Sequence, residues 1–382
     1  MERRSFLRVS VVGTAAAAFG GASWLNAFSA AADPGDGPYG PLLPADGNGL
    51  RLPDGFTGRI VAESGRRVGA SDYVWHPAPD GGACFAAADG GGWVYVSNSE
   101  VPSTGGVGAI RFAGDGSVVD AYRILDGTDV NCAGGATPWG TWLSCEEVDR
   151  GEVYETDPFG VADPIVRPAM GVFKHEACAV DADRRVVYLT EDVPDGGFYR
   201  FTPSNWPDLS AGTLEILIGE PGQTSGAVTW ARVPDPSAAD EDTRHQVDGA
   251  KPFDGGEGCY YAAGTCWFTT KGDNRVWAYD ADAGTIGLTY DDDSPLAGVD
   301  NVTGAASGDL FVAEDGDNLE ICLITPDGIV APFVRVEGHE NSEITGPAFS
   351  PDGTRLYFSS QRGPSGQSED GVTFEVRGPF RT

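Results

Sequence analysis

The chain has 382 residues, of which 57 are acidic and 25 are Lys or Arg, and its formal net charge is −32 at pH 7. So negative a surface repels phosphate backbones, which excludes a nucleic-acid-binding protein that works through a basic face. Hydrophobic residues make up 41% of the chain, which excludes a disordered polymer. The 55 Gly and 26 Pro residues indicate many turns and favour an all-β fold over a helical bundle.

Residues 1–32 have the pattern of an export signal. Arg3 and Arg4 form a twin-arginine pair, and an uncharged stretch rich in Ala and Gly follows. This stretch is too weakly apolar to predict a stable membrane span, and no other segment of the sequence could cross a bilayer. We therefore expect the twin-arginine export machinery to deliver the folded protein to an extracytoplasmic location. We expect a single domain over residues 33–382.

A repeated strand pattern follows the signal. Each of six segments joins a turn, an aromatic-aliphatic strand and a polar end: residues 92–100, 140–147, 185–192, 265–271, 309–315 and 355–361. Their starts lie roughly 45 residues apart, with one gap near 80, and this period is typical of a four-stranded propeller blade. We predict an all-β, six-bladed β-propeller. We also predict an insertion with outer strands near residues 202–251, and a ring-closing strand in residues 373–380.

A second strand series precedes the first, and each of its members begins with a polar or metal-competent residue. These starting residues are Asp80, Asn131-Cys132, His175-Glu176, Glu257, Asp300-Asn301 and Glu343. The innermost strand of each propeller blade lines the central channel, so equivalent positions converge at one end of it. We therefore expect acidic and thiol side chains to meet there.

Carboxylate density is the main chemical signal, because common catalytic motifs such as G-x-S-x-G, the P-loop and H-E-x-x-H are missing. Taken singly, a pair such as Glu191-Asp192 reads as a solvated strand end, and only its recurrence favours a site. Converging carboxylates need cations to neutralise them. Oxygen ligands favour Ca²⁺, Mn²⁺ or a ferric ion, and a thiolate among them favours iron over Ca²⁺.

The stretch from Asn131 to Glu147 resembles the PhoX-type alkaline phosphatases. The matching runs are NCAGG at 131–135, TPWGTW at 137–142, CEE at 145–147, FKHEA at 173–177 and YLTED at 188–192. The resemblance extends to the twin-arginine signal and to most of residues 50–362. It implies a propeller that carries Fe³⁺ and Ca²⁺ ions and hydrolyses a small phosphorylated substrate.

Position by position, the resemblance also implies roles for individual residues. Cys132 corresponds to an iron ligand and Glu176 to an iron or calcium ligand, and with Glu257 they form the expected catalytic set. The implied metal ligands are Cys132, Glu146, Glu147, Glu176, Glu191 and Glu257, and Glu343 joins them as the starting residue of the sixth inner strand. Asn131 corresponds to a neighbouring polar group that contacts substrate.

The sequence departs from the family pattern at one cation. The family motif has an arginine two residues before the glutamate that matches Glu257, and here that residue is Gly255. Lys251, Lys271 and Arg275 are the candidates to replace it as substrate-binding groups. Loss of such a cation weakens charge stabilisation of a phosphoryl group, so the metal site is the firmer expectation.

Two other functions are consistent with the same acidic channel. One is a calcium-dependent lactonase or esterase, and the other is a non-catalytic propeller stabilised by calcium. The Cys132 motif argues against the non-catalytic propeller, because a structural calcium site gains nothing from a thiolate. Iron content and a comparison of lactones with phosphate esters separate the three.

Overall fold

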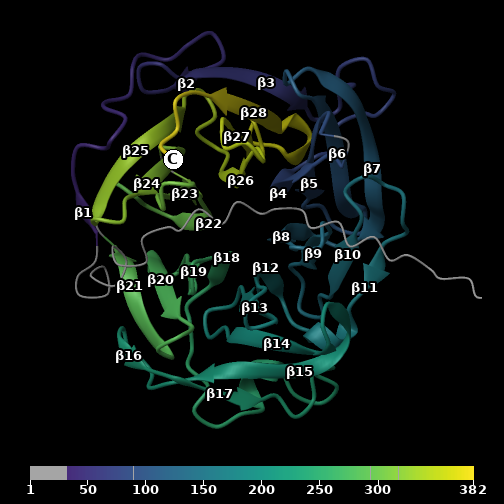
Figure 1. The fold of residues 1–382 in the computed structure, drawn as a ribbon, viewed down its shortest axis with the longest axis vertical. Helices are drawn as coiled ribbons and strands as arrows, with labels where there is room; N and C mark the ends of the chain where they lie inside the picture. Colours follow the sequence, from purple (N-terminus) through teal and green to yellow (C-terminus); the bar gives the residue numbers. More distant parts are fainter. Residues whose placement is uncertain (1–31, 89, 293, 317) are drawn as a thin grey trace, which may run out of the picture.

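The computed structural model describes residues 32–88, 90–292, 294–316 and 318–382, so Arg3 and Arg4 of the predicted signal lie outside them. Six sheets stand as blades around a central channel, which confirms the predicted six-bladed propeller (Figure 1). Helix in the described residues is limited to three short turns: η2 (Pro168–Met170), η3 (Thr243–His245) and η4 (Ser368–Asp370). No described helix has the length and apolar character of a membrane span.

Blades 1 to 3 follow one another along the chain, and each runs from the channel outward. Blade 1 consists of β4 (Pro79–Ala86), β5 (Gly92–Ser99), β6 (Gly105–Ala113) and β7 (Val118–Thr128). Blade 2 consists of β8 (Asn131–Ala136), β9 (Trp142–Glu146), β10 (Val153–Thr156) and β11 (Ile165–Val166). Blade 3 consists of β12 (His175–Asp181), β13 (Val186–Glu191), β14 (Phe198–Asn205), β15 (Asp208–Ile218) and β17 (Thr229–Arg232).

Blades 4 to 6 complete the ring and take strands from both ends of the described chain. Blade 4 consists of β18 (Gly256–Ala262), β19 (Thr265–Thr270), β20 (Arg275–Asp280), β21 (Thr285–Asp291) and β16 (Gly226–Ala227). Blade 5 consists of β22 (Val299–Gly304), β23 (Leu310–Glu314), β24 (Glu320–Ile324) and β25 (Ile329–Val336), edged by β1 (Asp33–Pro34) and β2 (Leu50–Arg51). Blade 6 consists of β26 (Ile344–Phe349), β27 (Arg355–Ser360), β28 (Val372–Arg377) and β3 (Thr57–Glu63).

Two features of this topology correspond to specific sequence patterns. The predicted closing strand is β28, and its antiparallel pairing with β3 joins the late chain to the early chain (Figure 1). Residues 202–251 supply outer strands, because β15 and β17 extend blade 3 while β16 pairs with β21 of blade 4. This segment therefore bridges two blades at the outer rim, away from the channel.

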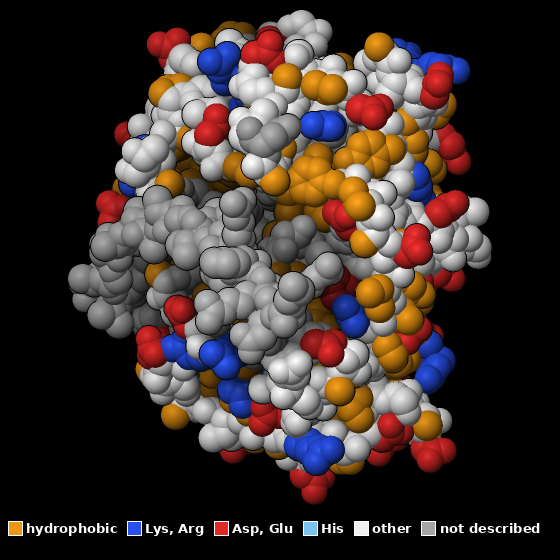
Figure 2. All heavy atoms as spheres, turned by 45° about the vertical axis from the view of Figure 1, so that its right-hand side comes forward, with side chains coloured by type: hydrophobic (Ala, Val, Ile, Leu, Met, Phe, Trp, Pro, Cys, Tyr) orange, Lys and Arg blue, Asp and Glu red, His pale blue; other side chains and the backbone are white. Residues whose placement is uncertain are grey.

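The apolar core is divided among the gaps between neighbouring blades. Each of six buried clusters joins residues of neighbouring blades, as Phe198 of blade 3 stacks on Phe268 of blade 4 at 4.1 Å between ring centroids. Because both faces of each sheet are buried, the strands read as aromatic and aliphatic runs. Part of the surplus of acidic residues lies on the outer surface of the propeller, where Figure 2 shows scattered acidic side chains.

Candidate metal centre

A break in strand pairing occurs near the start of the inner strand in all six blades, one residue later in blade 6 than in the others. The inner strand advances three residues while the second strand advances two, as between Pro79/Ser99 and Gly82/Ser97 in blade 1. The other breaks follow Asn131, His175, Gly256, Val299 and Thr345. Such a β-bulge re-aims the side chains of the extra residues, so each inner strand has one specially oriented position.

Five of these six positions carry a potential metal ligand. The residue directly after the last regular pair is Asp80, Cys132, Glu176, Glu257 or Asp300 in blades 1 to 5. In blade 6 it is Gly346, which has a φ of 59°. This differs from the expected place of Glu343, which lies three residues earlier, before β26 begins. A Cβ at Gly346 would lie 2.6 Å from the carbonyl oxygen of Asp80, so close approach of blades 6 and 1 requires glycine there.

A second set of polar side chains lies one residue beyond each second strand. In every blade, the main-chain N–H of this residue donates to the carbonyl of the residue that precedes the inner strand, as Glu147 does to Val130 at 2.8 Å. The set is Glu100, Glu147, Asp192, Lys271, Asp315 and Gln361. Antiparallel pairing therefore places it at the same end of the channel as the inner-strand ligands.

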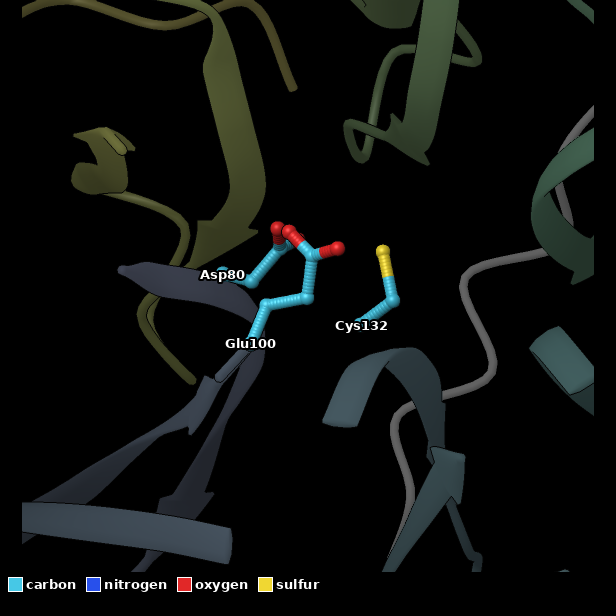
Figure 3. A group of neighbouring side chains, drawn as sticks. All are labelled: Asp80, Glu100 and Cys132. Carbon is cyan, nitrogen blue, oxygen red and sulfur yellow. The ribbon is translucent and has the colours of Figure 1, made fainter. Parts of the chain in front are cut away.

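The two sets combine into three overlapping groups of ligand atoms. They are Asp80–Glu100–Cys132, Cys132–Glu147–Glu176 and Glu176–Glu257–Asp300, and the ligand atoms of each lie within 4.8 Å of one another. Figure 3 shows the first group, in which the Asp80 and Glu100 carboxylates lie side by side and the Cys132 sulfur lies next to the Glu100 carboxylate. Because Cys132 and Glu176 each belong to two groups, the three groups form one continuous row. The Cys132 thiol donates to Glu176 Oε1 at 3.3 Å.

Burial makes ionisation of this row unfavourable. Desolvation and neighbouring carboxylates raise the pKa of Glu176 well above its usual range, and they raise that of Glu100 to about 8. Desolvation also raises the pKa of Asp300 to about 7 and that of the Cys132 thiol well above its ordinary value. Bound cations would reverse each of these shifts, since they stabilise the ionised ligands.

Two carboxylate oxygens in the row lack hydrogen-bond donors. Glu176 Oε2 and Glu257 Oε1 are buried without a hydrogen-bond partner in the described residues, and of the two only Glu257 Oε1 has an ion-pair contact there, with Lys271 Nζ at 3.1 Å. Leaving a buried polar atom unsatisfied costs about 1–3 kcal/mol, and more for a charged group. Oxygen donors clustered in this way suit hard cations, and the single thiolate suits iron. The residues present therefore fit a mixed iron and calcium centre.

Three positively charged side chains contact the carboxylates around this row. Lys174 Nζ lies 2.9 Å from Glu147 Oε1 and 2.7 Å from Asp192 Oδ2. Lys271 Nζ lies 3.1 Å from Glu257 Oε1. Arg362 Nη2 lies 2.7 Å from Glu343 Oε1. Glu343 is thus held by an arginine beside the row and belongs to none of the three groups.

Two predicted ligands, Glu146 and Glu191, face away from the row. Glu146 accepts hydrogen bonds from the main-chain N–H groups of Asp129 and Glu152, at 2.9 and 3.2 Å. Glu191 accepts from Gly197 N, from Tyr199 Oη and from Arg244 Nη1, at 2.8, 2.7 and 2.9 Å. Both carboxylates are therefore occupied by loop and side-chain donors.

The structure also separates the predicted substrate-binding residues. Lys251 is buried against the rings of Phe253 and Trp277, at 4.7 and 5.0 Å. Arg275 pairs with Asp273 and Asp291, at 2.9 and 2.7 Å. Asn131 is buried, and its amide donates to Ser144 Oγ at 2.9 Å. Of the three candidate cations, Lys271 is the one that contacts a ligand group.

Asp80, Glu100 and Asp300 belong to the row but were not among the predicted ligands. Asp80 and Asp300 had been identified as starting residues of inner strands, and Glu100 as the end of a second strand. The signal that could have selected them is the position relative to the strand pairing. Asp80 and Asp300 lie within the register break, while Glu100 directly follows the second strand.

Comparisons with known proteins agree with this architecture. The family model described as alkaline phosphatase PhoX matches residues 104–157, 148–286 and 278–363, about two thirds of the chain. No curated protein matches the sequence significantly.

Solved structures give further matches. The structure of Pseudomonas fluorescens PhoX, in complex with the transition-state analogue vanadate, has a TM-score of 0.71 and 17% identity, covering 88% of this chain and 97% of that one. A structural genomics protein of unknown function from Bacteroides thetaiotaomicron has a TM-score of 0.52 and 12% identity, covering 88% of this chain and 83% of that one. At such identities, these two likenesses establish the fold.

Proposed function

The chain belongs to the alkaline phosphatase PhoX family, and we propose that it hydrolyses phosphate esters at an iron- and calcium-containing centre in the propeller channel. The observation that carries the proposal is the row of three overlapping ligand groups, with one thiol among buried carboxylates. When bound, such cations polarise a phosphoryl oxygen and lower the pKa of a water molecule.

The charge balance of the channel supports the need for cations. The carboxylates at this end are Asp80, Glu100, Glu147, Glu176, Asp192, Glu257, Asp300, Asp315 and Glu343. Only Lys174, Lys271 and Arg362 oppose them among the ion pairs of the described residues. A phosphorylated substrate would be repelled from a site with this excess of negative charge. Polyvalent cations would reverse the sign of the potential and make phosphate binding favourable.

Cys132 would hold iron, and the carboxylates would divide between iron and calcium. Asp80 and Glu100 complete the group on one side of Cys132, and Glu147 and Glu176 complete the group on the other. A buried thiol without a metal is inert, whereas a cation would stabilise the thiolate in place of a proton. A centre made only to stabilise the fold with calcium would gain nothing from this thiol.

Lys271 is the best candidate to take the place of the arginine expected at Gly255. Its main-chain N–H donates to the carbonyl of Gly255 at 2.8 Å, so the two residues are neighbours across the strand end. Gly255 itself has a φ of 69°, a backbone conformation that is strained for arginine. An ammonium group at Lys271 can neutralise charge on a phosphoryl oxygen beside the third ligand group.

Hydrolysis of an aryl phosphate by protein loaded with iron and calcium tests the proposed activity. We expect turnover of 4-nitrophenyl phosphate, and no comparable turnover of a lactone panel under the same conditions. Activity on lactones alone would favour the calcium-dependent lactonase. Absence of all turnover in fully loaded protein would contradict the phosphatase and leave a calcium-stabilised binding propeller.

We also propose that the twin-arginine machinery exports the protein after folding. The proposal rests on Arg3 and Arg4 and on the uncharged stretch that follows them. Replacing both with lysine in the full chain should keep the protein in the cytoplasm, as measured by fractionation. Normal export of that double variant would contradict this route.

A further inference from the structure

Lys271 is an exception among six equivalent positions. In the other five blades, the residue directly beyond the second strand is an acid or an amide: Glu100, Glu147, Asp192, Asp315 or Gln361. These positions share the same main-chain hydrogen bond to the residue before the inner strand. Blade 4 therefore has an ammonium group at the position where the other blades have a side chain with a potential oxygen ligand.

The ammonium group lies beside the third ligand group, Glu176–Glu257–Asp300. Lys271 Nζ is 3.1 Å from Glu257 Oε1 and 3.4 Å from Asp315 Oδ2. Because the ligand atoms of Glu176, Glu257 and Asp300 lie within 4.8 Å of one another, a charge in contact with Glu257 is close to any cation that the group holds. The contact with Glu257 Oε1 is close but not aligned as a hydrogen bond. It is therefore mainly a charge interaction.

The first ligand group, Asp80–Glu100–Cys132, has different neighbours. Within the described ranges, no lysine or arginine forms an ion pair with Asp80 or Glu100. Their polar partner is the neutral amide of Gln361, whose Nε2 donates to Asp80 Oδ2 at 2.6 Å and also to Glu100 Oε2. Arg362 pairs with Glu343 and acts on Glu100 only at longer range, so in the described part of the chain the first group has no ammonium or guanidinium in contact with its ligand atoms.

We propose that Lys271 is an internal counter-ion that neutralises part of the negative charge of the third group. The third group should therefore bind a divalent cation more weakly than the first. The inference rests on the proposed metal centre but does not depend on phosphatase activity. An ammonium group and a divalent cation a few ångströms apart in a half-buried site repel each other. The energy of this repulsion exceeds the free energy that corresponds to a tenfold change in the binding constant. In protein stripped of all metals, we therefore expect calcium to bind the third group more weakly than the first.

Calcium titration of the chelator-treated full chain by isothermal titration calorimetry tests this inference. Lys271→Met removes the charge but keeps the length of the side chain, and it should tighten the weakest class of calcium site at least about tenfold. Lys271→Arg keeps the charge and should leave the weak class in place. Arg275→Met is the matched control, because Arg275 lies in the same blade but pairs with Asp273 and Asp291.

A second measurement keeps the test decisive if the metal-free Lys271→Met protein does not fold. The calcium-dependent rise in Tm of Lys271→Gln, measured from a low starting concentration, should reach half its size at lower calcium than in the wild type. If the weakest calcium sites of both variants bind calcium no more tightly than those of the wild type, the inference is wrong, although the metal centre itself would stand. Absence of calcium binding by wild type and variants alike would overturn both.

Discussion

Adjacent carboxylates at the ends of the second strands have different surroundings. Glu146 accepts main-chain hydrogen bonds from its loops, while Glu147 joins Cys132 and Glu176 in a ligand group. Glu314 repeats the first pattern in blade 5, where it accepts from Ala297 N and Glu320 N at 2.9 and 3.0 Å. Side chains alternate along a strand, so a single step in sequence moves a carboxylate from the loops to the channel.

This contrast shows why burial alone does not identify a metal ligand. Glu191 and Glu176 are both fully buried. Glu191 has donors for both oxygens, including Arg244, whereas Glu176 Oε2 has none in the described residues. A satisfied buried carboxylate stabilises the loops that it caps, and an unsatisfied one requires a proton or a cation.

The largest expected effect is loss of the thiolate. Cys132→Ala should lower kcat/KM for an aryl phosphate by at least about 100-fold, because it removes a member of two ligand groups. Cys178→Ala is the control, since Cys178 is a buried thiol of the core between blades 2 and 3. Steady-state kinetics with iron and calcium present measures both. Equal activity of Cys132→Ala and wild type would contradict the assignment.

A pair of glutamine variants separates the two kinds of carboxylate. Glu191→Gln should lower the free energy of unfolding by about 1–3 kcal/mol, because it breaks the charged contact with Arg244. It should leave calcium affinity unchanged. Glu176→Gln should stabilise the metal-free protein and weaken metal binding, since a neutral amide replaces a carboxyl group whose ionised form is unfavourable when buried. Chemical denaturation and calorimetry measure both quantities, and matching behaviour of the two variants would refute the distinction.

The metal-free protein should lose stability as pH rises. Desolvation and Glu147 raise the pKa of Glu100 to about 8, and desolvation raises that of Asp300 to about 7, against about 4 for both in the unfolded chain. Their favourable contribution is complete below about pH 4 and disappears as pH rises through the folded-state values. We expect Tm without metal to fall between pH 5 and pH 8.

Two controls sharpen this pH dependence. Glu100→Gln should make the fall in Tm shallower, because it removes one of the titrating groups. Saturating calcium should also reduce the fall, since it compensates the ionised carboxylates. A metal-free Tm that is constant or rises over this range would show that the row does not carry the raised pKa values.

The smallest expected effect concerns the buried lysine outside the row. Lys251→Met should leave kcat/KM and calcium affinity nearly unchanged, because Lys251 packs on Phe253 and Trp277. Parallel assays of Lys251→Met and wild type, with the same metals, measure this. A large rise in KM with unchanged Tm would restore Lys251 to the substrate-binding residues.

The fold was predictable because its signal repeats. Turn residues and aromatic-aliphatic strands recur with the blade period, and they gave six blades and the closing strand. The convergence of Cys132, Glu176 and Glu257 at one end of the channel was predictable for the same reason. The register break was not visible in the sequence, because a β-bulge depends on pairing between strands.

The errors in placing individual side chains have related causes. Glu343 was expected at the sixth equivalent position, but it lies before β26 begins, and the residue after the last regular pair in blade 6 is Gly346. The sequence could not show which of Glu146 and Glu147 is directed toward the channel, because the direction of each side chain depends on where the strand ends. The donors to Glu191 come partly from Arg244, more than 50 residues away, and nothing local in the sequence predicts that contact.

Elemental analysis of the protein purified from cells that export it is the most direct test of the metal centre. We expect both iron and calcium in the wild type, and loss of iron with retained calcium in Cys132→Ala. Full iron content in Cys132→Ala would contradict the thiolate ligand. Calcium without iron in the wild type would contradict the proposed centre itself.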